Sequence, residues 1–190
     1  MHDPRITRLA QVLIDHSCKL QAGEHILIEA FDLPDPQLVT ELVRLAAEKA
    51  AIPLVTWKDN RILRAIYQHG TREGLSLIGE LEKARMEQMD CYVGIRGAAN
   101  SSQFADVPRG QMDLYQECWW KPVHIETRVP KTRWVVLRYP TPSFAQAAKM
   151  SCESFENFFF DVCTADYARM EENQKPLAER MRAADQVRIT

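Results

Sequence analysis

The sequence predicts an α/β fold: a three-layer α/β/α domain with a mostly parallel sheet of about five strands. Short apolar runs of strand length alternate along the chain with longer stretches whose apolar residues recur at helical spacing. Strands joined by helical crossovers pair in parallel, and a parallel sheet is covered by helices on both faces. The 190 residues contain no repeat, low-complexity tract or linker, so we expect a single domain over residues 1–190.

The first half of the chain is expected to supply three strands. A helix begins at Asp3-Pro4, because aspartate suits an N-cap and proline suits the first helical turn. Its inward face is formed by Ile6, Leu9, Ala10, Leu13 and Ser17. The strands are HILIEA (25–30), IPLVTW (52–57) and CYVGIRG (91–97). The helices between them are predicted at about 38–50, from Asp59 or Asn60 to Gly70, and at about 71–88, the last with Leu75, Leu77, Ile78 and Leu81 as its apolar residues.

The second half is expected to supply two further strands. A helix follows Pro108, RWVVLRY (133–139) is the fourth strand, and QVRIT (186–190) is the fifth. Pro140 ends the fourth strand, since proline cannot donate to the ladder. Thr141 and Pro142 then open a helix as its N-cap and first residue.

The next helix is capped by Ser151 and is rich in phenylalanine. Its inward stripe is predicted to be Phe155, Phe158, Phe159 and Val162. Phe160 lies about 140° from Phe155 on the helical wheel, so we expect it to be an exposed anchor for a partner. Trp119 and Trp120 are adjacent and must be packed from two sides to be buried. These aromatic residues predict either an interface or ordinary core packing.

Composition excludes several classes of protein. The net charge of -2 provides no basic field for nucleic acid or for an anionic membrane. The N-terminal MHDPRITRL is too polar for a signal peptide, and no apolar run approaches the ~20 residues that span a bilayer. The cysteines are odd in number and widely spaced, which predicts reduced thiols and a cytoplasmic location. They are Cys18, Cys91, Cys118, Cys152 and Cys163.

Several motifs come in the order found in one enzyme family. The stretch RWVVLRYPTPSFAQAAKMSCESFENFFF combines a tryptophan-containing strand, Pro140-Thr141-Pro142, Ala145-Gln146, Met150-Ser151 and an acidic helix with phenylalanines. RLAQVLIDHSCKLQAGEHILIEA and GIRGAAN provide further matches. From about Arg5 to Thr190 the chain resembles the N-terminal domain of the aminopeptidase T and aminopeptidase S family of metallo-aminopeptidases, the thermophilic metalloproteases.

This resemblance implies a parent enzyme that removes N-terminal residues from peptides. It implies two divalent metal ions, zinc, cobalt or magnesium, that polarise the scissile carbonyl and generate hydroxide near neutral pH. The family's metal ligands follow a strand that corresponds to VRI (187–189), so the resemblance places them after Thr190, in a C-terminal domain. We therefore assign no catalytic, metal-binding or cofactor-binding residue to this chain. The domain is expected to line the substrate cleft and to support a homodimer.

The residues themselves offer only weak alternatives for chemistry. His124 and Glu126 could share one face of an extended segment as metal ligands, but no third ligand is evident, and a polar pair at a strand edge explains them better. Cys118 with His124 could be a nucleophile and its base, or a cysteine at a helix end beside packing tryptophans. Glu153, Glu156 and Asp161 form either a solvated face or an acid-base set. Gly94 and Gly97 lack the spacing of a phosphate-binding loop.

A second hypothesis for function belongs to another class. A chain without metal ligands also fits a stand-alone, non-catalytic α/β binding or scaffolding module.

Overall fold

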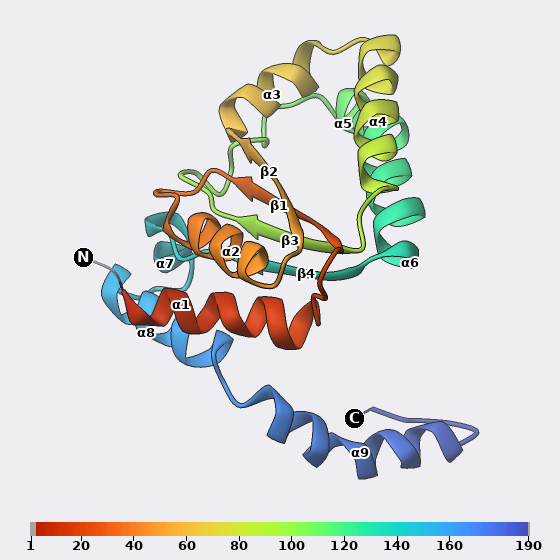
Figure 1. The fold of residues 1–190 in the computed structure, drawn as a ribbon. Coiled ribbons are helices and arrows are strands. Elements are labelled where there is room, and N and C mark those ends of the chain that lie inside the picture. The colour runs from red at the N-terminus through yellow and green to blue at the C-terminus, as the bar shows by residue number, and fades with distance from the viewer. Residues whose placement is uncertain (1–2, 190) are drawn as a thin grey trace.

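The computed structural model of the chain describes residues 3–189. Its strands are β1 (His25–Phe31), β2 (Ile52–Lys58), β3 (Cys91–Arg96) and β4 (Arg133–Arg138). They form a sheet in the order β2-β1-β3-β4, with all three pairings parallel (Figure 1). This confirms the predicted fold class. Residues 186–189, expected to belong to a fifth strand, have no regular structure, and Thr190 lies outside the described residues.

One face of the sheet is covered by the two ends of the chain. The helices on this face are α1 (Pro4–Gln11), the π-helix η1 (Val12–Ser17), α2 (Gln37–Glu48) and α8 (Cys152–Cys163). They pack on alternate residues of the central strands, among them Ile26, Ile28, Val93 and Ile95, which are fully buried. The aspartate predicted as the first N-cap is confirmed, because Asp3 Oδ1 accepts a hydrogen bond from the backbone N–H of Arg5.

The opposite face is covered by the middle of the chain. The helices here are α3 (Asn60–His69), α4 (Arg72–Met86), α5 (Arg109–Tyr115), the π-helix η2 (Gln116–Arg128) and α6 (Val129–Lys131) (Figure 1). Leu27 and Tyr92 of the sheet are buried against Leu75, Trp119 and Val123 of this layer. The side chains of Asp59 and Thr71 cap α3 and α4. The three-layer arrangement is thus confirmed.

The phenylalanine helix α8 faces the core with a different side from the one predicted. Phe160 is only 3% exposed and packs beside the ring of Phe159, with the guanidinium carbon of Arg5 4.6 Å from its ring centre. Phe158 is 54% exposed and Val162 is also exposed. The prediction of Phe160 as an exposed anchor is therefore wrong. The helical wheel shows which apolar residues share a side of α8, but it does not show which side meets the core. That side is set by contacts with α1 and with the ring of Tyr139.

The segment that contains His124 is also different from the expectation. We expected a strand edge around His124 and Glu126, but both residues lie in the helix η2. Two of the apolar residues predicted for α4, Leu77 and Leu81, are exposed. Helix–helix packing of α4 against η2 uses the face of Gly79 instead.

The turn after β4 forms as predicted. Pro142 is the first residue of α7 (Pro142–Ala147), and Thr141 is its N-cap. The Thr141 hydroxyl does not bond a helix N–H and instead lies 3.2 Å from Ser143 Oγ, which donates to the Ala98 carbonyl at 2.6 Å. Ser151 caps α8 as expected, since its Oγ accepts from the Ser154 N–H.

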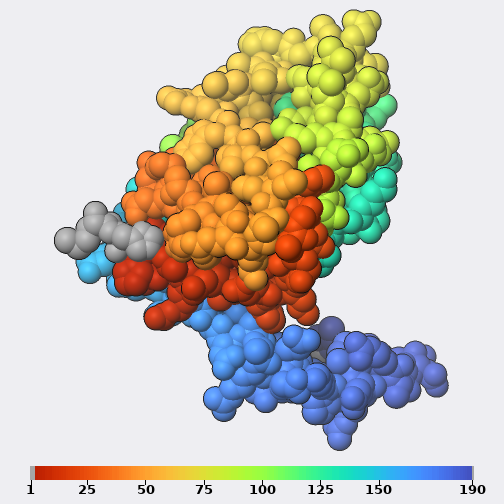
Figure 2. Space-filling view, in the orientation of Figure 1, coloured from red at the N-terminus to blue at the C-terminus, as the bar shows by residue number. Residues whose placement is uncertain are grey.

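The last helix, α9 (Tyr167–Ala183), projects from the rest of the molecule (Figures 1 and 2). None of its residues is buried. Its exposed apolar side chains include Met170, Leu177 and Met181. No helix within residues 3–189 combines the length and apolar character needed to cross a membrane.

Candidate functional site at the carboxyl edge of the sheet

The four strands end in register at one edge. Phe31, the last residue of β1, pairs in register with Lys58 of β2 and Arg96 of β3, and Arg96 pairs with Arg138 of β4. The final residues of β2, β3 and β4 are therefore cations, and residues in register point to the same face of a sheet. The carboxyl edge of a parallel α/β sheet is where such folds bind ligands.

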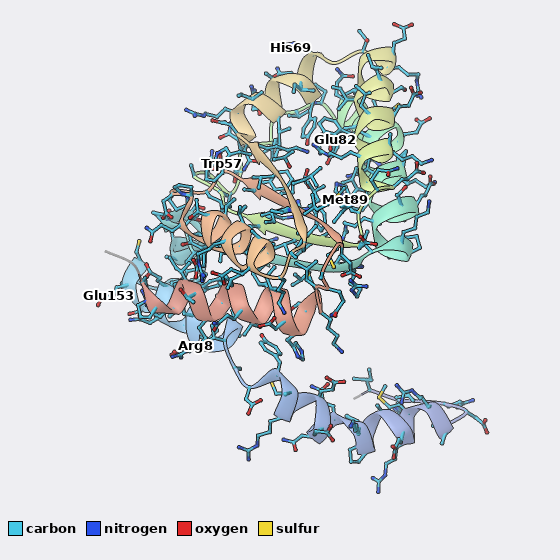
Figure 3. The ribbon with its side chains drawn as sticks, in the orientation of Figure 1. Arg8, Trp57, His69, Glu82, Met89 and Glu153 are labelled. Carbon is cyan, nitrogen blue, oxygen red and sulfur yellow. The ribbon has the colours of Figure 1, made fainter. Side chains whose placement is uncertain are left out.

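A buried ion pair lies behind this edge. Glu29 of β1 is 1% exposed, and its Oε1 accepts a hydrogen bond from Lys58 Nζ at 2.6 Å. Its Oε2 accepts a 2.5 Å hydrogen bond from the Tyr92 hydroxyl. Lys58 Nζ also lies 3.5 Å from Glu82, which projects from α4 over this face (Figure 3). The charge of Lys58 is thus matched by two carboxylates.

The ion pair keeps Glu29 ionised. Burial alone would raise the pKa of Glu29, but the charge and hydrogen bond of Lys58 outweigh it, with the Tyr92 hydroxyl adding to them, and the pKa falls below its usual range. Burial and the nearby Glu29 charge raise the pKa of Tyr92 well above its usual value, so Tyr92 is a neutral hydrogen-bond donor. These groups act as a fixed structural unit between β1, β2 and β3.

His124 enters the same region from η2. It is 6% exposed, and burial lowers its pKa to about 4. The positive charge of Arg128 lowers the pKa further, while Glu29 opposes the shift. Arg128 Nε donates to His124 Nδ1 at 3.2 Å, so the neutral ring carries its proton on Nε2. His124 is therefore an uncharged imidazole with an N–H on Nε2 at neutral pH.

Among the cavities at the carboxyl edge, two share part of their walls. The first, of about 130 Å³, is lined mainly by aromatic and apolar side chains, together with Lys58 and His124. The second, of about 200 Å³, extends to Arg138, Asn100 and Ser101. Four residues line both cavities: Phe31, Asn60, Arg96 and Phe104. The two cavities are therefore neighbouring parts of one surface.

Asp32 holds the loops around these cavities. It follows β1 in a left-handed conformation, with φ of 49°. Its Oδ1 accepts from the Asn60 N–H at 3.2 Å and its Oδ2 from the Ala99 N–H at 3.0 Å. At Gly97 a Cβ would lie 2.5 Å from the Asp32 carbonyl oxygen, so the loop after β3 can approach only as glycine. This close approach explains why residue 97 is a glycine, without a phosphate-binding loop.

The sequence alternatives for chemistry are not brought together. His124 is buried, whereas Glu126 points outward and pairs with Lys121 at 3.6 Å. The Cys118 sulfur accepts a hydrogen bond from Arg72 Nη1 at 3.6 Å. The ring of His124 contacts Tyr92 and Trp120. Glu153 and Asp161 are exposed, and Glu156 pairs with Arg5 at 2.5 Å. Within residues 3–189 no three His, Cys, Asp or Glu side chains are grouped so that they could hold a metal ion.

The residues that lie together at this edge of the sheet were not predicted from the sequence. Glu29 is an acidic residue inside the apolar strand HILIEAF, and a charge in a buried strand requires a partner. Lys58, Arg96 and Arg138 each end a strand, and the parallel topology places such residues at one edge. Both signals are present in the sequence.

Comparison with solved structures finds a protein of similar fold. AmpT from Thermus thermophilus superposes with a TM-score of 0.68 at 16% identity, over 90% of this chain and 46% of that chain. The chain thus spans less than half the length of AmpT, and at this identity the likeness shows the fold alone. The CurK enoyl reductase gives a TM-score of only 0.33 at 10% identity, over 91% of this chain and 49% of that chain, which does not support a shared fold.

A search among curated proteins gives no match. The family model of the thermophilic metalloproteases (M29) matches residues 2–187. This match covers nearly the whole chain, so the chain belongs to the thermophilic metalloprotease (M29) family.

Proposed function

We propose that this chain is the N-terminal domain of a metal-dependent aminopeptidase that releases amino acids from the N-termini of peptides. The observation that carries the proposal is the family match over residues 2–187, together with a structural match that covers 46% of AmpT. The role of the domain is to line the substrate cleft with the carboxyl edge of its sheet. The peptide substrates and a C-terminal domain are its partners.

The family implies a divalent metal, and we propose two ions of zinc, cobalt or magnesium for the whole enzyme. When bound, such ions polarise the scissile carbonyl and supply a hydroxide near neutral pH. Residues 3–189 do not fit this role, because they bring no three suitable ligands together. The residues of this domain therefore contribute binding and positioning: a fixed Glu29–Lys58 pair, a neutral His124, and the arginines of the sheet edge.

We further propose a homodimer and a cytoplasmic location. The apolar side chains that α9 exposes support the dimer, and the five free cysteines support a reducing compartment.

The proposal is tested by comparing the 190-residue chain with the full product of its open reading frame. Both are assayed for aminoacyl-anilide hydrolysis with zinc, cobalt or magnesium. We expect turnover from the full product and none from the 190-residue chain. A reading frame that stops at codon 190, or a longer product that retains no metal and has no turnover, would instead support the stand-alone binding module.

A further inference from the structure

Two arginines at the sheet edge lack an anionic partner. Within residues 3–189 neither Arg96 nor Arg138 makes a side-chain hydrogen bond or an ion pair, although both line the second cavity. The guanidinium carbon of Arg96 lies 4.9 Å from the ring centre of Phe31, and that of Arg138 lies 5.3 Å from Phe144. A guanidinium that packs on an aromatic ring still has its N–H groups available for a planar anion.

A buried amide faces the same space. Asn60 is only 7% exposed, and it lines both cavities. Its backbone N–H bonds Asp32, but its side-chain amide makes no hydrogen bond to any residue of the described chain. A carboxamide this deeply buried normally has a partner, because burial without one costs free energy. Because Asn60 lines both cavities, its carboxamide is available to a polar group that enters them.

The nearby acidic groups are already engaged. Glu29 and Glu82 bind Lys58, and Asp106 binds Arg64. Asp32 accepts the backbone N–H groups of Asn60 and Ala99. The positive charges of Arg96 and Arg138 are therefore left for a ligand.

The two cavities differ in chemistry. The second combines Arg96, Arg138 and the amide of Asn60, which suits a carboxylate, since arginine binds carboxylates through paired N–H groups. The first, of about 130 Å³, contains the rings of Tyr67, Tyr115 and Trp119 and suits an apolar side chain. A molecule that has a carboxylate next to an apolar side chain would fill both.

We propose that this edge binds the free α-carboxylate of a short peptide whose C-terminal residue is apolar. Arg96 and Arg138 bind the carboxylate, Asn60 bonds the last peptide group, and the apolar side chain enters the aromatic cavity. The choice of a peptide rests on the proposed aminopeptidase function. The consequence is a preference for short substrates, because the enzyme would recognise both ends of the peptide.

Calorimetric titration of the 190-residue chain in EDTA tests this inference. The probes are Gly-Leu-Phe with a free carboxylate and the same tripeptide as its amide. We expect the free acid to bind at least about tenfold more tightly than the amide. Arg96→Gln and Arg138→Gln each remove that preference, whereas Arg109→Gln, at an exposed position of α5, leaves it unchanged. Arg138 is exposed, so its substitution tests the site even if Arg96→Gln impairs folding.

Three results would overturn the inference: no binding of the free acid, equal binding of acid and amide, or binding unaffected by both arginine substitutions. Inorganic phosphate is titrated in parallel. If phosphate binds as tightly as the tripeptide and displaces it, the site takes small anions and not peptides. The titration requires neither metal nor turnover, so its failure leaves the aminopeptidase proposal intact, and an inactive full-length product would not affect its success.

Discussion

At the scale of single residues, Glu29 and Lys58 are the most informative pair. A charge buried to 1% exposure is tolerated because Lys58 and the Tyr92 hydroxyl both bond it. Breaking a buried pair by removing one partner leaves an uncompensated charge, whereas replacing both partners with apolar residues does not. Loss of one partner should therefore cost more stability than replacement of both.

We expect Glu29→Ala to lower the free energy of unfolding by about 3 kcal/mol. The double substitution Glu29→Leu with Lys58→Met should be less destabilising than Glu29→Ala. Urea denaturation measures both. Glu172→Ala, which breaks the exposed pair with Lys175 on α9, is the control and should change stability by less than about 1 kcal/mol. Equal effects of Glu29→Ala and Glu172→Ala would contradict this view of the pair.

His124 makes stability depend on pH. Its pKa is lowered to about 4 in the folded state from an ordinary value of 6.5, so between these values the unfolded chain binds a proton that the folded chain does not. Stability therefore falls as the pH drops from 6.5 to about 4, by about 3 kcal/mol for this group. The pKa of Glu29 is also lowered on folding, so its contribution is lost at still lower pH, below its unfolded value.

Unfolding at pH 7, 5.5 and 4.5 checks the role of His124. His124→Gln should flatten the decline between pH 6.5 and 4.5, and His69→Gln, at an exposed position, should leave it as in the unsubstituted chain. If the free energy of unfolding falls equally in the His124→Gln variant, other groups cause the pH dependence.

At the scale of elements, strands and caps could be read from the sequence because they depend on neighbouring residues. HILIEA and RWVVLRY lie within one residue of β1 and β4, and the side-chain caps by Asp3 and Ser151 were predicted. Thr141 occupies the predicted N-cap position of α7, but its hydroxyl does not bond a helix N–H. The face of α8 could not be read, because a helical wheel shows which residues share a side but not what that side meets. The helix at 116–128 was missed since Pro122 and the tryptophan pair obscure its periodicity.

The contact of α4 with η2 depends on Gly79. A Cβ at Gly79 would lie 2.1 Å from the Cys118 carbonyl oxygen, so alanine would force the two helices apart. We expect Gly79→Ala to destabilise the protein by about 1–3 kcal/mol. Gly110→Ala, in α5, meets no atom within 4 Å and should be neutral or slightly stabilising through helix propensity. Thermal denaturation of the two variants compares them, and equal melting temperatures would mean that the helices adjust freely.

At the scale of the whole molecule, the fold class and the family could be inferred from the order of weak motifs. The lateral order β2-β1-β3-β4 could not, because the sequence gives strands in chain order only. The candidate site depends on that lateral order, because the sheet brings Lys58, Arg96 and Arg138, up to 80 residues apart in sequence, to one edge, with Phe31 between Lys58 and Arg96. This is why the site was not found from the sequence, although each of its residues lies within one residue of the end of a predicted strand.

The dimer proposed for the whole molecule depends on α9. Leu177 is 61% exposed on a helix that has no buried residue. If α9 forms the dimer contact, Leu177→Ser should weaken self-association about tenfold or more in sedimentation experiments. Leu81→Ser, at an equally exposed position of α4, is the matched control and should have no effect. Unchanged association of the Leu177 variant would move the interface elsewhere.

The most direct measurement for the central claim is the metal content and peptidase activity of the 190-residue chain. The chain is incubated with zinc or cobalt, desalted, analysed for metal and assayed on aminoacyl-anilides. The account predicts no retained metal and no turnover, because the described residues bring no three metal ligands together. Retention of about two ions per chain with turnover would contradict it, since the catalytic centre would then lie within these residues.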